Sequence, residues 1–318
     1  MIDKNTVGII LVKQIIIIFA VFIGLSISGC GSNSSSDNDY GGRSGSDKGR
    51  LTLSITDGPI DEVTEVWVQF TAIELKPADS SSTTITFDAP VDINLLNLQG
   101  SLSQDFFNAA VVDSGAYNWV RLAVNADADG TFDSYLVMKD GSEHELHIPS
   151  GSQTGLKINT GFTVVSNTEV AMTIDFDLRK SIVMSGSDYH LKPVLRMVEN
   201  EKSGSTSGSI VDTVTGCPDD LPDTGNAVYI FSGADAEVDD IDGNLPEPVT
   251  TALLSLNVGT GEYDYEIGFL PEGNYTVAYT CMADQDDPKA DDAIIFSQVT
   301  NVTVSSSSGS TGGAEFNR

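Results

Sequence analysis

Residues 172–179 read Met172-Thr173-Ile174-Asp175-Phe176-Asp177-Leu178-Arg179, and apolar and polar side chains alternate along the whole run. Successive side chains of a β-strand point to opposite faces, so this period of two predicts a strand with one apolar face and one charged face. The same alternation occurs at residues 51–56 and 66–70. Beyond the first 29 residues, no stretch keeps the period of an amphipathic helix, so the sequence predicts an all-β protein.

Turn residues divide the chain into many short segments. We expect a strand at 117–124, a turn at 127–130 and a returning hairpin strand at 131–138. A glycine stands two positions before a strand tyrosine in Gly115-Ala116-Tyr117 and again in Gly273-Asn274-Tyr275, a turn that suits the edge of a β-sandwich. Short strands with frequent turns predict two β-sandwich domains, Ig-like or transthyretin-like, and disfavour a parallel α/β sheet.

The first 29 residues have the three parts of a signal peptide. Lys4 precedes an apolar run centred on 15–23, and the ending Leu25-Ser26-Ile27-Ser28-Gly29-Cys30 resembles a bacterial lipobox. We therefore expect cleavage before Cys30 and acylation of its thiol by diacylglycerol, with palmitate as a typical chain. A retained membrane helix is the alternative, but it needs about 20 apolar residues. Gly31, where aspartate would signal retention, favours the outer membrane of a Gram-negative envelope.

Acidic residues dominate the chain. Loss of Lys4, Lys13 and Asp3 with the signal peptide leaves 14 basic and 45 acidic residues, a formal charge of −31. Nucleic acid is excluded as a partner, because its phosphates are bound by Lys and Arg. Two interpretations of the charge stay open: a solubilising surface and the uptake of divalent cations.

Composition also sets the expected boundaries. Ser- and Gly-rich tracts separate the segments, and they cannot bury enough apolar surface to order themselves. We expect a signal peptide at 1–29, a flexible tether at 30–49, a first β-sandwich at 50–200, a linker at 201–208, a second β-sandwich at 209–304 and a low-complexity tail at 305–318.

Six separated motifs between residues 50 and 199 occur together in a familiar order. They are residues 53–59 (LSITDGP), 95–98 (LLNL), 115–122 (GAYNWVRL), 148–157 (IPSGSQTGLK), 175–181 (DFDLRKS) and 191–194 (LKPV). In this order they resemble the bacterial family called domain of unknown function 4382, which occurs in exported lipoproteins. The resemblance implies an envelope location, and because the family has no established activity it implies no catalytic residues.

Residues 208–304 are similar, more generically, to a carboxypeptidase regulatory-like or transthyretin-like β-sandwich. The similarity lies in Gly208-Ser209-Ile210-Val211 and in Leu270-Pro271-Glu272-Gly273-Asn274-Tyr275-Thr276-Val277. Such modules are usually accessory or structural. Cys217 and Cys281 both fall in this half, and in an exported protein a disulfide between them is the default expectation; free thiols or a metal pair are the alternatives.

Three groups of acidic residues are candidate calcium sites, because calcium prefers oxygen ligands. The first group, Asn125, Asp127, Asp129, Gly130 and Asp133, imitates the start of a calcium loop, although Leu136 stands where a bidentate Glu is needed. An ordinary Asp-Gly hairpin explains the same residues. The second group is Asp240, Asp242, Gly243 and Asn244, and the third is Asp284, Asp286, Asp287, Asp291 and Asp292. Apart from calcium, the sequence indicates no cofactor.

Asp175, Asp177 and Arg179 share one face of the expected strand. Paired carboxylates can hydrolyse glycosides, and the same spacing also forms a structural ladder of ion pairs. We favour the structural interpretation and expect a non-enzymatic, lipid-anchored module of the cell envelope that serves binding, adhesion or structure. Its candidate partners beyond the membrane are polysaccharide and another envelope protein. The competing hypotheses are an envelope hydrolase acting on polysaccharide and a calcium-binding surface protein.

Overall fold

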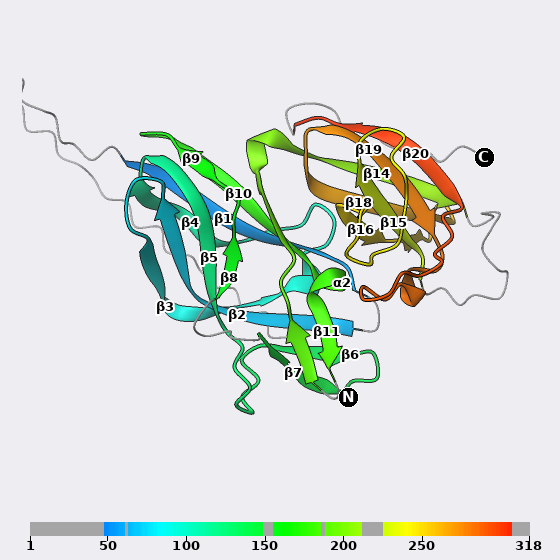
Figure 1. Ribbon diagram of the computed structural model, residues 1–318, viewed down its shortest axis with the longest axis horizontal. Helices are drawn as coiled ribbons and strands as arrows, with labels where there is room; N and C mark the ends of the chain where they lie inside the picture. The colour runs from blue at the N-terminus through cyan, green and yellow to red at the C-terminus, as the bar shows by residue number, and fades with distance from the viewer. Residues whose placement is uncertain (1–47, 61–62, 149–154, 186–187, 212–224, 307–318) are drawn as a thin grey trace, which may run out of the picture. The chain divides into compact units, whose positions relative to one another are not determined.

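A central pair of parallel strands, β1 (Lys48–Gly58) and β10 (Glu169–Asp177), organises the first sheet. β4 (Gln104–Asp113) flanks β1 and β13 (Leu195–Glu199) flanks β10, both antiparallel, in the order β13-β10-β1-β4 (Figure 1). This computed structural model describes residues 48–60, 63–148, 155–185, 188–211 and 225–306. Strands dominate these residues, which confirms the predicted all-β class.

The second sheet has nine strands built around the long strand β2 (Val63–Pro77), in the order β11-β12-β7-β6-β2-β5-β8, with β3 on β2 and β9 on β5. The other strands are β3 (Thr83–Asn94), β5 (Gly115–Asn125), β6 (Tyr135–Met138), β7 (Glu143–His147), β8 (Leu156–Ile158), β9 (Phe162–Val164), β11 (Ile182–Ser185) and β12 (Asp188–Leu191).

The hairpin expected between residues 117–124 and 131–138 is wrong. β5 pairs with residues 69–77 of β2 and β6 with residues 63–67, so the two strands follow one another along β2 and do not fold back on each other. Ser134 draws the ends of the intervening loop together, because its hydroxyl donates to the Asn125 carbonyl at 2.6 Å and accepts the Gln69 N–H at 3.1 Å.

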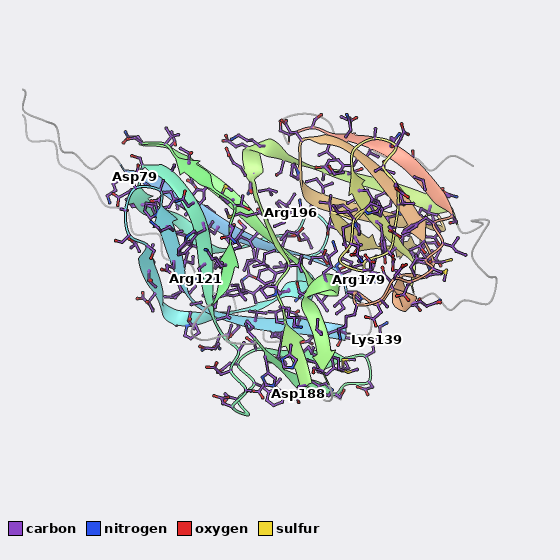
Figure 2. The ribbon with its side chains drawn as sticks, in the orientation of Figure 1. Asp79, Arg121, Lys139, Arg179, Asp188 and Arg196 are labelled. Carbon is purple, nitrogen blue, oxygen red and sulfur yellow. The ribbon has the colours of Figure 1, made fainter. Side chains whose placement is uncertain are left out.

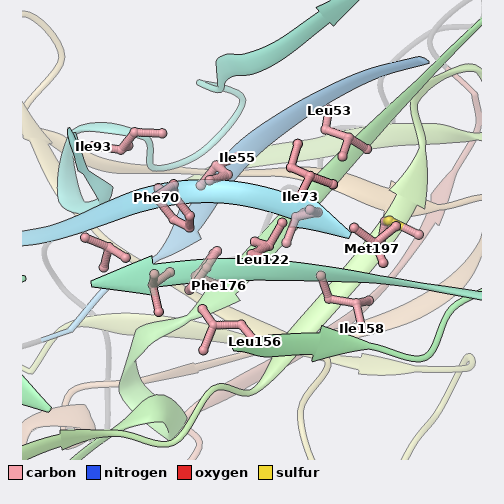
Figure 3. Packing of buried hydrophobic residues seen from close by; sticks show 14 of the residues in the cluster. Leu53, Ile55, Phe70, Ile73, Ile93, Leu122, Leu156, Ile158, Phe176 and Met197 are labelled. Carbon is pink, nitrogen blue, oxygen red and sulfur yellow. The ribbon is translucent and has the colours of Figure 1, made fainter. Parts of the chain in front are cut away.

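The two sheets pack face to face over one apolar core, which makes the first sandwich. Leu53 and Ile55 of β1 and Phe176 of β10 are fully buried against side chains of the second sheet such as Phe70 and Leu122 (Figure 3). The rings of Phe70 and Phe176 meet edge to face, with centroids 6.2 Å apart. Each such side chain contributes roughly 1.5–3 kcal/mol through burial.

The second sandwich also packs one sheet on another. β14 (Ser203–Val211), β18 (Glu262–Pro271) and β17 (Ser255–Asn257) form one sheet, and β16 (Thr250–Leu253), β15 (Ala227–Ser232), β19 (Gly273–Thr280) and β20 (Gln298–Val304) form the other. Ile210 and Ile267 from the first of these sheets meet Val277 from the second in the core. The outer face of β15 and β19 carries a smaller apolar cluster that includes Tyr229, Phe231, Ile241 and Ala283.

Residues 201–208 do not form the expected linker. A short 3-10 helix, η2 (Asn200–Lys202), leads directly into β14, which pairs with β18. The small side chains of this segment serve close packing: a Cβ atom on Gly204 would stand 2.0 Å from the carbonyl oxygen of Ser305. The Gly- and Ser-rich composition here therefore reflects a strand against which another segment of the chain packs closely.

Helical structure among the described residues is limited to single turns. These are η1 (Leu95–Asn97), η2, η3 (Ala283–Gln285) and the α-helix α2 (Leu178–Ser181). None of the helices in the described ranges is long or apolar enough to span a membrane. The signal peptide, Cys30 and nearly all of the tether lie outside the described residues, as does Cys217.

Both expected glycine-tyrosine turns form the same contact. The Tyr117 hydroxyl donates to the carbonyl of Asp113, and the Tyr275 hydroxyl donates to the carbonyl of Pro271, each over 2.8 Å. In both cases the acceptor lies four residues earlier, across the turn that joins two strands. This is the arrangement of a tyrosine corner in immunoglobulin-like sandwiches.

Candidate functional site

A cleft of about 820 Å³ lies between the two sandwiches. The first sandwich contributes Thr56, Asp57 and Asp175 to its walls, and the second contributes the residues around Ser207–Ser209, Thr250–Ser255 and Asp264–Gly268. Most of the side chains that face this cleft are hydroxyls and carboxylates. The cleft therefore offers many more hydrogen-bond acceptors than donors.

Parallel pairing explains why two acids of the cleft wall lie at the same end of the first sheet. Thr56 of β1 is in register with Asp175 of β10, so Asp57 and Asp175 come from the same ends of neighbouring strands. Beside them, the N–H of Gly268 donates to the carbonyl of Gly100 at 3.1 Å. A Cβ atom on Gly268 would stand 2.5 Å from that carbonyl oxygen, so glycine is required for the two sandwiches to approach here.

Asp57 is the most strongly perturbed acid of the cleft. Burial raises its pKa well above the usual range, and the nearby charges of Asp175 and Asp177 raise it further. The backbone N–H groups of Leu178 and Gly58 act in the opposite direction and do not outweigh burial. Asp57 can therefore keep its proton at pH values where an exposed carboxyl has lost it, and a protonated carboxyl can donate a hydrogen bond.

Asp175 is neutralised by a cation. The Arg196 guanidinium donates to its carboxylate from the neighbouring strand β13, and the same guanidinium donates to the carbonyl of Phe269 at 2.6 Å (Figure 2). Arg196 therefore fixes one acid of the first sandwich and one backbone carbonyl of the second. The sequence analysis did not single out Arg196, because its partner is distant along the chain.

The expected charged face of Asp175, Asp177 and Arg179 does not exist as a unit. The strand ends at Asp177, whose side chain accepts the Lys180 N–H and caps α2, so Arg179 lies on a helical turn. Arg179 donates to the carbonyl of Ala283 at 2.5 Å and lies over the ring of Tyr229 (Figure 2). An ion pair at Asp175 does form, but its partner is Arg196 and not Arg179.

Asp177 is separated from the cleft by its own contacts. Its carboxylate lies 3.3 Å from Lys180 Nζ, which also reaches Glu247 at 3.2 Å and donates to the carbonyl of Pro248 at 2.6 Å. Burial raises the pKa of Asp177, and the positive charge of Lys180 partly offsets this effect. Of the two acids selected from the sequence, Asp175 alone lines the cleft, where it is joined by Asp57.

The first candidate calcium loop is occupied by turn contacts. The Asp129 carboxylate accepts the Thr131 N–H at 2.8 Å, which lowers its pKa, and Glu145 accepts the N–H groups of Asp129 and Gly130. Asp127 and Asp133 do not join Asp129 in any group of three potential metal ligands within the described residues. The geometry there is that of a tight loop that connects β5 to β6.

Members of the other two candidate groups converge. Asp240 from the second group and Asp286 and Asp292 from the third place one carboxylate oxygen each within 4.8 Å of one another. Asp242 instead accepts from Asn244, and Asp287 accepts the Lys289 N–H, while Asp284 and Asp291 are exposed and lie outside the group. Sequence spacing could not show this convergence, because the strands between the two loops bring them together.

Cys281 is buried in the core of the second sandwich. Its expected partner, Cys217, lies outside the described residues. The disulfide therefore stays a prediction.

The strand order and the cleft can be compared with known proteins. Residues 48–193 match the family model described as a domain of unknown function, DUF4382. This match confirms the resemblance drawn from the six motifs, and it covers just under half of the chain. The DUF4382 segment holds Asp57 and Asp175, whereas Arg196 follows its end.

Several solved structures show a weak likeness to the chain. The minor pilin GBS52 of Streptococcus agalactiae is 12% identical, with 84% of this chain and 95% of that chain covered and a TM-score of 0.18. A proposed adhesin from Bacteroides ovatus is 8% identical, with 91% of this chain and 95% of that chain covered and a TM-score of 0.19. The major pilin subunit of Bacillus cereus is 11% identical, with 85% of this chain and 100% of that chain covered and a TM-score of 0.19. These scores are too low to carry an argument about fold or function beyond the DUF4382 match. No curated protein sequence matches the chain significantly.

Proposed function

We propose that the protein is a lipid-anchored, non-catalytic binding module of the cell envelope, and that the cleft between its sandwiches binds a hydroxyl-rich ligand, with polysaccharide as the ligand class. The observation that carries this proposal is the acceptor-rich cleft of about 820 Å³. Its volume falls in the range of small-molecule sites, and it accommodates a few sugar units.

The chemistry of the walls supports a sugar ligand. Hydroxyl groups of a sugar are donors, and the residues that line the cleft include the acids Asp57, Asp175, Asp264 and Glu266. Thr251 adds a buried hydroxyl oxygen that has no hydrogen-bond partner among the described residues. A buried polar atom without a partner costs free energy, and a bound hydroxyl would remove that cost.

The anchoring part of the proposal rests on the sequence. The signal-like residues 1–29 and the lipobox-like ending at Cys30 support acylation, and the two acyl chains of a diacylglycerol are enough for firm attachment. In this proposal the second sandwich, as a carboxypeptidase regulatory-like module, serves as the accessory wall of the cleft. Mass spectrometry of the mature N-terminus tests the anchor, and an unmodified Cys30 would refute it.

Binding is tested with the full chain on a glycan array, in parallel with the variants Thr251→Val and Thr163→Val. Thr251→Val removes the unpartnered cleft hydroxyl and keeps the side-chain shape, so we expect a loss of glycan retention of about tenfold. Thr163 lies exposed on β9, away from the cleft, and its variant should bind like the wild type. Equal binding by all three proteins would contradict the cleft as the binding site.

A second function is favoured by one specific observation. Asp57 has a raised pKa, whereas Asp175 is paired with Arg196, and such a difference is how glycosidases separate the acid from the base. An envelope hydrolase is therefore the competing proposal. Release of reducing sugar that is abolished by Asp57→Asn and by Asp175→Asn would favour it, and binding without release favours the module.

A further inference from the structure

Two loops of the second sandwich meet over the outer face of β15 and β19. Residues 233–249 and 281–297 contribute Ile241, Ala283 and Phe296, which pack on Tyr229 and Phe231 of β15. Asp240, Asp286 and Asp292 lie at the junction of these loops, with one carboxylate oxygen of each within 4.8 Å of the others. Three negative charges thus share a small volume beside an apolar cluster.

Asp240 has an unsatisfied oxygen in this group. The residue is 1% exposed, and its Oδ2 accepts the Asp292 N–H at 2.5 Å. Its Oδ1 is buried and has no hydrogen-bond partner among the described residues. A buried carboxylate with an unpartnered oxygen, beside two further carboxylates, is unfavourable unless a positive charge lies among them.

The other two acids are held in position by neutral donors. Asp286 accepts the hydroxyl of Tyr229 at 2.5 Å and the N–H of Ile241 at 3.2 Å, and Asp292 accepts the N–H of Asp287 at 2.8 Å. These donors orient the carboxylates without neutralising them. They are the kind of outer contacts that hold metal ligands in place.

Among the described residues, two cations near these loops, Arg179 and Lys289, make hydrogen bonds to backbone carbonyls. Arg179 acts electrostatically on Asp286, but its guanidinium is directed to the carbonyl of Ala283 and the ring of Tyr229. Lys289 donates to the carbonyl of Met184 instead. The carboxylate of Asp239 adds further negative charge beside Asp240.

We propose that Asp240, Asp286 and Asp292 bind a calcium ion that fastens the loop 233–249 to the loop 281–297. All the candidate ligands are oxygens, which excludes the thiolate and imidazole chemistry preferred by zinc. The three oxygens lie within 4.8 Å of one another, so an ion between them is at most about 2.8 Å from each, and small side-chain movements bring it to a Ca²⁺–O distance of about 2.4 Å. Backbone carbonyls and water would complete the coordination. This site is independent of the cleft.

The site is tested by calorimetric titration of the metal-stripped full chain with CaCl2, together with thermal unfolding. We expect one saturable event per chain and a rise in Tm. Asp240→Asn should weaken binding at least tenfold, whereas Asp242→Asn, which changes a half-buried acid of the same loop that contacts Asn244 and lies outside the group of three, should leave affinity within twofold. MgCl2 should bind at least tenfold more weakly than CaCl2, because Mg²⁺ demands a stricter octahedron.

Folding of the variant is controlled in the same experiment. Without calcium, Asp240→Asn should melt at or above the wild-type temperature, since it removes an unpaired buried charge. If Asp240→Asn does not fold, Asp292→Asn, at a half-buried position, replaces it with the same expected loss of binding. Absence of heat and of a Tm rise in the wild type, an equal loss in Asp242→Asn, or equal affinity for both metals would each overturn the proposal.

Discussion

Asp175 and Arg196 stand in register on the neighbouring strands β10 and β13, and their ion pair also reaches the second sandwich through the carbonyl of Phe269. The side chain of Asp175 is 7% exposed in this pair. One guanidinium thus both satisfies a buried acid and joins the two walls of the cleft. The cleft acids are therefore held by contacts that also set the distance between the sandwiches.

Arg196→Met should destabilise the protein by about 3–5 kcal/mol, because it leaves the buried carboxylate of Asp175 without a cation. The measurement is urea unfolding at neutral pH. Lys202→Met is the matched control: its partner is Glu199 and its side chain is 72% exposed, so the change should leave the free energy of unfolding almost unaltered. Similar losses in both variants would show that Asp175 does not depend on Arg196.

Asp57→Asn should stabilise the protein at neutral pH, by on the order of 1–3 kcal/mol. The folded-state pKa of Asp57 is raised, so its contribution to stability is full below the unfolded pKa and is lost as the pH rises through the folded pKa. The difference between variant and wild type should therefore be near zero at about pH 3.5 and grow toward pH 7.

The comparison in Asp57→Asn isolates one group. Asp175 and Asp177, whose charges act on Asp57, and their partners Arg196 and Lys180 are present in both proteins, so their contributions largely cancel in the difference. Unfolding free energies measured at several pH values check the trend. A difference that stays constant or shrinks with rising pH would mean that folding does not raise the pKa of Asp57.

Tyr117→Phe and Tyr275→Phe should each cost about 1 kcal/mol, because each removes one hydrogen bond to a strand-end carbonyl. Thermal unfolding gives the measurement, with Tyr135→Phe as a half-buried control. If the corners have equal roles, the two losses should agree within about 0.5 kcal/mol. Loss in neither variant would mean that the glycine turns alone position these strands.

Reduction of the protein should lower its stability by about 4 kcal/mol if Cys217 and Cys281 are joined. Thiol titration of the unfolded, unreduced chain should find neither of these two thiols free. A Cys217→Ser, Cys281→Ser double variant that unfolds like the wild type would contradict the bond.

The sequence predicted the strands and missed the contacts between them. The alternation at 51–56 and 172–177 was enough to predict β1 and β10, because one face of each strand packs in the core. It could not show that the other face, with Thr56 and Asp175, is also buried, because the cover comes from distant segments. The end of β10 was missed because Asp177 caps a helical turn within an unbroken alternating pattern.

At the candidate sites, too, the sequence indicated single residues but not the contacts that bring them together. Asp57 lies in the quoted motif Asp57-Gly58-Pro59, directly after an alternating strand, and that position was the available signal for it. Its partner Asp175 was selected, but the parallel pairing that joins them was not. Asp240 and Asp286 were assigned to separate groups, since sequence spacing carries no information about which loops share a sheet face.

The parallel pairing of β1 with β10 has a consequence for how the chain is made. Leu51, in the first described strand, finds its neighbour Val170 only after most of the first sandwich has been synthesised. Contacts this distant along the sequence slow folding. A polypeptide that crosses a translocase N-terminus first would therefore remain unfolded during passage. Its first sheet, with β1 paired to β10, would form after export.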